Sequence, residues 1–152
     1  PRIVVNPTQL DAGRGYLDAL LIHEAVHVAT NAPCDPAGPQ WVREGLAEWV
    51  AAEHSPSTRA YDREWVVWHL SRHQVPRSLP SDADFTGADD DEVLSAYALS
   101  ALAVDVAVRR LGRTGAMTFL DGLSLPVPPE AGAVDDLTGW YRAELGRIAA
   151  SG

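Results

Sequence analysis

The sequence predicts an α+β fold that is predominantly helical, with a small β element at its N-terminus. Two observations carry this prediction. Apolar residues recur at the three- to four-residue spacing of helices through most of the chain, whereas one short segment near the start, "RIVVNP", is β-branched and ends at a proline. Loops rich in proline and glycine separate the helical segments.

The first elements are a strand and a helix. Arg2 to Asn6 is predicted to be an edge strand, because Pro7 follows it directly. Tyr16 to Thr30 is predicted to be a helix that is mostly buried, since apolar side chains crowd most of its circumference (Leu17, Leu20, Leu21, Val26, Val28). The prolines of "NAPCDPAGP" end this helix in a stiff loop.

The rest of the chain is predicted to be helices joined by loops. We expect helices at about 40–53, 57–73, 90–111, 116–122 and 135–149. Ser57 is the expected cap of the helix at 57–73, and Gly112 ends the helix at 90–111. The segment "QVPRSLPSDADFTGADD" is predicted to be a loop.

Length and charge limit the possible functions. The 152 residues, 46% of them hydrophobic, suit one domain over residues 1–152, expected to be a piece of a longer chain because it begins without methionine. With 12 Lys+Arg against 21 Asp+Glu, no nucleic-acid partner is expected. No apolar run reaches the length of about 20 residues that spans a membrane. The compartment and the oligomeric state stay open.

The segment "LIHEAVHVAT" contains the motif HExxH. His23 and His27 are four residues apart, so on a helix their imidazoles point the same way and can bind one cation. Glu24 points beside that cation, where it can take a proton from a water molecule. The alternative is that both histidines are exposed or separately hydrogen-bonded, but their apolar surroundings disfavour it. The motif therefore predicts one zinc ion with an open coordination position.

A third ligand is expected from the next helix. The metzincin continuation of HExxH is missing, because Thr30 and Pro33 occupy its places. "WVREGLAEWV" instead offers Glu44 and Glu48, which share a helical face and repel each other unless a cation lies beside them.

HExxH followed by "EGLAEW" resembles the gluzincin metallopeptidases, particularly the compact peptidase MA-like domains with a zincin-like fold. This resemblance implies that Glu44 is the third zinc ligand and that Glu48 hydrogen-bonds a zinc-binding histidine, His23. A weaker similarity covers "SAYALSALAVDVAVRRLG", where the resemblance implies that Tyr97 donates to the oxyanion. The alternative is that Tyr97 is a core residue.

The resemblance implies a zinc-dependent peptidase acting on a peptide or protein, with Glu24 activating the water. The strand at residues 2–6 would then bind extended substrate along its edge. An endopeptidase is expected rather than an aminopeptidase, since a motif that holds a free amino terminus is missing. The alternative is a non-catalytic, peptidase-like zinc-binding or interaction module.

Other polar groups have simpler interpretations. His69 and His73 in "WHLSRH" are also four residues apart, but Leu70 stands where HExxH has its glutamate. We interpret His69 and His73 as residues of a helix end, with a second metal site as the alternative. His54 is also interpreted as a residue near a helix end. The acidic segment "ADDDE" lacks the EF-hand pattern and is interpreted as a helix start.

Overall fold

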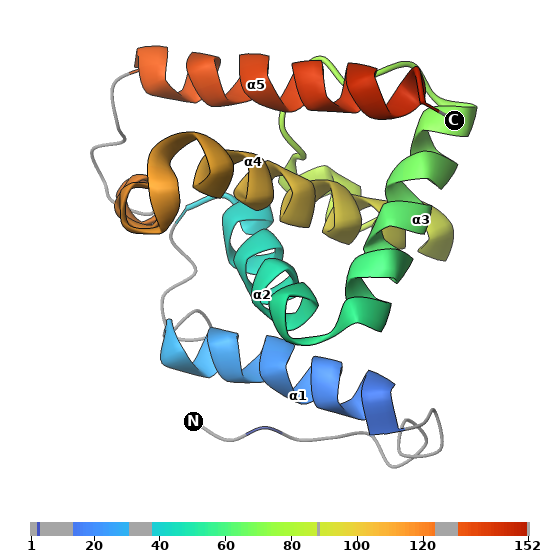
Figure 1. The fold of residues 1–152 in the computed structure, drawn as a ribbon, viewed down its shortest axis with the longest axis vertical. Helices are drawn as coiled ribbons and strands as arrows, with labels where there is room; N and C mark the ends of the chain where they lie inside the picture. Colours follow the sequence, from blue (N-terminus) through green and yellow to red (C-terminus); the bar gives the residue numbers. More distant parts are fainter. Residues whose placement is uncertain (1–2, 4–13, 31–37, 88, 124–130, 152) are drawn as a thin grey trace.

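The computed structural model describes residues 3, 14–30, 38–87, 89–123 and 131–151. Within these ranges the chain forms five α-helices and one 3-10 helix, η2: α1 (Arg14–Ala29), α2 (Gln40–His54), α3 (Pro56–Arg72), η2 (Asp82–Phe85), α4 (Asp90–Gly122) and α5 (Ala131–Ala149). Figure 1 shows α4 crossing the middle of the molecule, with α5 along one side of it and α2 on the other. α1 packs on the far side of α2, at the opposite edge from α5.

The predicted α+β fold class is wrong, because the described residues are all helical or loop and contain no β-strand. Of the strand predicted at Arg2 to Asn6, only Ile3 is described, and it lies outside any strand. The prediction rested on a single segment with no second strand to pair with. A lone strand leaves its N–H and C=O groups without the ladder partners that stabilise a sheet.

α4 is the centre of the core, and small side chains let its neighbours approach closely. Ala98, Ala103 and Ala107 are at most 2% exposed. Gly45 of α2 lies against the backbone of Ser100: a Cβ atom built on Gly45 would lie 2.6 Å from the Ser100 carbonyl oxygen. α2, which carries the predicted third ligand Glu44, is therefore fixed directly against the central helix.

Most helix boundaries follow the predicted ones closely, but α5 begins earlier than predicted, at Ala131, and the segment predicted to be a loop contains η2. Ser55, rather than Ser57, caps α3: its hydroxyl accepts a hydrogen bond from the Thr58 N–H, and Pro56 takes the first helical position. The helices predicted at 90–111 and 116–122 run on as α4, interrupted at Gly112, whose φ of 71° is left-handed. The proline loop at 31–37, with Cys34, lies outside the described residues.

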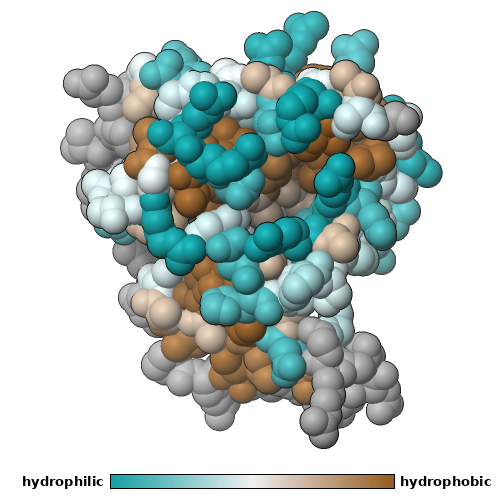
Figure 2. All heavy atoms as spheres, in the orientation of Figure 1, coloured by the Kyte–Doolittle hydropathy of each residue, from teal (hydrophilic) through white to brown (hydrophobic). Residues whose placement is uncertain are grey.

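α1 is less buried than its composition predicts. Of its described side chains only Ala19 is fully buried, while Tyr16 is 50% and Leu21 37% exposed. α1 lies at the edge of the bundle and packs on α2 and α3 from one side, so Figure 2 shows apolar surface at this end of the molecule. None of the described helices combines the length and the hydropathy needed to cross a membrane.

Candidate metal centre

The two histidines of HExxH lie on the side of α1 that faces α2. The apolar residues of α1 pack that helix on α2, and the four-residue spacing then directs both imidazoles at the neighbouring helix. Glu44 and Glu48, one turn apart on α2, meet them there. The structure therefore brings together His23, His27, Glu44 and Glu48, as the sequence predicts.

Three ligand atoms form a nearly equilateral triangle. The Nε2 atoms of His23 and His27 are 3.1 Å apart. Oε2 of Glu44 lies 3.4 Å from Nε2 of His23 and 3.2 Å from Nε2 of His27. The three side chains are 11%, 14% and 15% exposed, so the triangle is largely shielded by protein yet open to solvent on part of its surface.

This triangle has the size that a tetrahedral zinc ion requires. Bonds of about 2.0–2.1 Å at the tetrahedral angle separate neighbouring ligand atoms by about 3.3 Å. The ligand set, two imidazoles and a carboxylate, is one that zinc uses in catalytic sites and leaves a fourth position free. The spacing of His23, His27 and Glu44 thus suits one zinc ion.

Proton affinities in the cluster reflect the same close packing. Burial opposes protonation of His23, but Glu44 and Glu48 outweigh it and raise the pKa of the ring to about 9. Burial would raise the pKa of Glu44, yet His23 and His27 lower it to about 2. In the metal-free protein a proton on His23 therefore balances the carboxylates, and a metal ion must displace it.

The second nitrogen of His23 is held by Glu48. Nδ1 of His23 lies 2.8 Å from Oε2 of Glu48, so the ring donates from Nδ1 and turns Nε2 towards Glu44. Such a hydrogen bond fixes both the tautomer and the orientation of a metal-binding imidazole.

A carboxyl group that the sequence does not point to lies behind Glu48. Asp62 of α3 is hydrogen-bonded to Glu48, and burial, with the charge of Glu48, raises the pKa of Asp62 to about 8. The raised pKa favours the protonated form of Asp62, which can donate a hydrogen bond to the Glu48 carboxylate. The segment "AYDREW" has no motif that predicts this contact, because it depends on how α3 packs against α2.

Of the two predicted catalytic side chains, Tyr97 lies beside the same cluster. Glu24 is half-buried on α1, and the Tyr97 ring on α4 lies 6.1 Å from the His23 ring, between centroids, and 5.3 Å from the Phe85 ring. Burial, and then the charges of Glu44, Glu48 and Glu24, raise the pKa of Tyr97 to about 12. Its half-buried hydroxyl therefore keeps its proton beside three carboxylates and can donate a hydrogen bond.

Comparisons with protein-family models, with curated proteins and with solved structures found no match to this chain.

Proposed function

We propose that the protein is a zinc-dependent peptidase that cleaves internal peptide bonds. The observation that carries the proposal is the triangle formed by His23, His27 and Glu44, whose sides of 3.1 to 3.4 Å suit tetrahedral zinc. Glu24 adds the second requirement. A purely structural zinc site has no use for a general base next to its ligands, whereas a hydrolase needs one.

The residues divide the chemistry between them. Zinc, when bound, supplies a Lewis acid that polarises the substrate carbonyl and makes water more acidic. Glu24 accepts a proton from the attacking water and passes it to the amine as the carbon–nitrogen bond breaks. Tyr97 donates a hydrogen bond to the oxygen on which negative charge develops. Glu48 fixes the orientation of the His23 ring through the 2.8 Å contact between Nδ1 of His23 and Oε2 of Glu48.

Glu24→Gln separates catalysis from metal binding. The amide keeps the size of the side chain but cannot accept the proton, so we expect peptide hydrolysis to disappear while one equivalent of zinc stays bound at the His23 triangle. Cleavage of a library of internally quenched peptides measures the first property, and metal analysis the second. The control is Glu64→Gln, at an exposed glutamate of α3, which should leave both unchanged.

Three results would count against the proposal in different ways. If Glu24→Gln cleaves peptides as fast as the wild type, Glu24 is not the general base. If zinc-loaded wild-type protein cleaves no member of the library, the proposed peptidase activity is wrong, and a non-catalytic zinc-binding module explains the site better. If the triangle of His23, His27 and Glu44 binds no zinc, both the peptidase and the zinc-binding module are contradicted.

A further inference from the structure

A second group of metal-ligating side chains lies between α3 and α4. His69 and His73 are one turn apart at the C-terminal end of α3, and Glu92 lies in the first turn of α4. Nε2 of His73 is 2.8 Å from Oε1 of Glu92, and Nδ1 of His69 is 3.8 Å from Oε2 of the same carboxylate. One ligand atom from each residue lies within 4.8 Å of the other two.

The same residues line a cavity that holds a buried hydroxyl without a partner. The cavity measures about 480 Å³, and its walls include His69, His73, Asp84, Glu92, Ser95 and Tyr141. Tyr141 is 0% exposed, and its hydroxyl has no hydrogen-bond partner among the described residues. The volume of the cavity leaves room beside the two histidines and Glu92 for the water molecules that would complete the coordination of a metal ion.

We propose that His69, His73 and Glu92 form a second binding site for a divalent transition-metal ion of the zinc class, with solvent in the cavity completing its coordination. Two imidazoles and a carboxylate suit such ions rather than calcium or magnesium, which prefer oxygen ligands. The ion connects the end of α3 to the start of α4. This site shares no residue with the His23 cluster and does not depend on peptidase activity.

The geometry indicates that this second site binds more weakly than the first. The two histidines contact different oxygens of Glu92, Oε1 at 2.8 Å from His73 and Oε2 at 3.8 Å from His69, so the side chains must rearrange before one carboxylate oxygen and both nitrogens can meet at a single ion. His69 is 15% exposed, but the side chains of Glu92 and His73 are 36% and 43% exposed and free to adjust. Reorganising them costs part of the binding energy, which the triangle of His23, His27 and Glu44 avoids.

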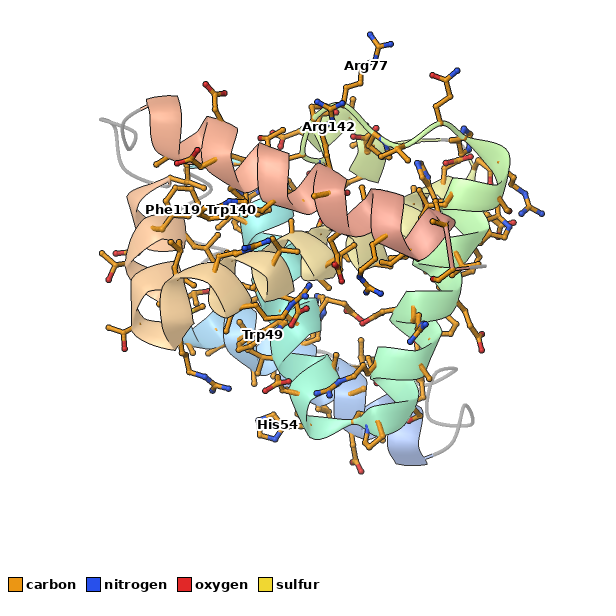
Figure 3. All side chains as sticks on the ribbon, turned by 45° about the horizontal axis from the view of Figure 1, so that its top comes forward. Trp49, His54, Arg77, Phe119, Trp140 and Arg142 are labelled. Carbon is orange, nitrogen blue, oxygen red and sulfur yellow. The ribbon has the colours of Figure 1, made fainter. Side chains whose placement is uncertain are left out.

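The test is calorimetric titration of the metal-free full chain with Zn²⁺ alone. We expect two equivalents for the wild type, the tighter one lost in the double variant His23→Gln/His27→Gln and the weaker one lost in His69→Gln/His73→Gln. The matched control is His54→Gln: Figure 3 shows His54 at the end of α2 pointing away from the helices, so its loss should leave two equivalents. Circular dichroism reports whether each variant folds. If His69→Gln/His73→Gln does not fold, the single variant His73→Gln, at an exposed position, should still weaken binding of the second equivalent at least tenfold.

Each stoichiometry decides between the sites. The second site is overturned if His69→Gln/His73→Gln retains two equivalents, or if the wild type binds one equivalent that His23→Gln/His27→Gln abolishes. The second site is supported and the first is wrong if the single equivalent survives His23→Gln/His27→Gln but not His69→Gln/His73→Gln. Thermal unfolding provides a second readout, because zinc should still raise the melting temperature of His23→Gln/His27→Gln, which retains only the second site.

Discussion

His23 determines the geometry of the metal centre because both of its ring nitrogens are used. Nδ1 is engaged by Glu48, which directs Nε2 at the position shared by His27 and Glu44. The helix alone places two histidines on one face, but it does not fix how their rings rotate. The glutamate on the second helix provides that orientation, so the site depends on α1 and α2 together.

Asp62 is predicted to position Glu48 through the hydrogen bond that its carboxyl group donates. Asp62→Ala removes this donor and should lower zinc affinity at the triangle by about 10- to 100-fold, the usual effect of losing an outer hydrogen bond. Asp62→Asn should restore most of the affinity, because its amide also donates. Competition with a chromophoric chelator measures both constants. Equal losses in the two variants would show that packing, rather than the hydrogen bond, is what Asp62 contributes.

Tyr97 is predicted to act on the transition state and not on substrate binding. Its raised pKa, about 12, keeps the hydroxyl protonated, and Tyr97→Phe removes only that hydroxyl. We expect kcat to fall by about 10²- to 10³-fold with little change in KM, as for other oxyanion donors. Steady-state kinetics on one cleaved peptide measure both. Unchanged kcat would return Tyr97 to the alternative role of a core residue packed on Phe85.

At the scale of the helices, Gly45 controls how closely α2 approaches α4. A methyl group at this position would lie 2.6 and 2.7 Å from the carbonyl oxygen and carbon of Ser100. These are backbone atoms of a buried helix, so they cannot rotate away as a flexible side chain would. The small residue between Glu44 and Leu46 is therefore required by packing, independently of any role in metal binding.

Gly45→Ala is predicted to destabilise the fold by about 1–3 kcal/mol, because the two helices must separate to admit the methyl group. Urea unfolding followed by circular dichroism measures the loss. Gly139→Ala on α5 is the matched control: Gly139 is exposed, nothing lies within 4 Å of its added Cβ atom, and the substitution should stabilise by about 0.5–1 kcal/mol. If Gly45→Ala were as stable as the wild type, the close contact between α2 and α4 would be wrong.

The sequence predicts helices well and their partners less well. Local periodicity and turn residues locate α1, α2 and α3, and the i, i+4 spacing on α1 predicts that His23 and His27 converge. That Glu44 joins them is implied by the resemblance of "EGLAEW" to the gluzincins. The strand at residues 2–6 is a different case, because β-branched residues alone do not provide a second strand. The depth of α1 was also overestimated, since composition does not specify which helices lie at the edge of a bundle.

Contacts between helices cannot be predicted from the sequence where no motif connects the residues involved. The carboxyl group of Asp62 is adjacent to Glu48 only because α3 packs against α2. Glu92 completes the group with His69 and His73 only because α3 also packs against the start of α4. Asp62 and Glu92 lie in segments whose sequence is explained by helix formation, so no local pattern marks either carboxyl group as a partner.

For the whole molecule, the cluster at His23 links stability to pH and zinc. The pKa of His23 is about 9 in the metal-free fold and 6.5 in the unfolded chain, so its contribution is complete below pH 6.5 and is lost as pH rises through 9. Asp62, raised from 3.8 to about 8, adds a loss of the same sign. Glu44, lowered from 4.5 to about 2, acts oppositely, and its contribution is lost as pH falls through that lower range.

The melting temperature of metal-free protein is therefore predicted to fall between pH 6.5 and pH 9, with His23 alone accounting for a free-energy loss on the order of 3 kcal/mol. Zinc should reverse this trend, because it takes the place of the proton on His23 and binds more tightly as that proton becomes easier to remove. Calorimetric scans with zinc and with chelator measure both curves. His23→Gln should flatten the metal-free curve to the part due to Asp62. A wild-type curve that stays level up to pH 9 without metal would contradict the close contact of His23 with Glu44 and Glu48.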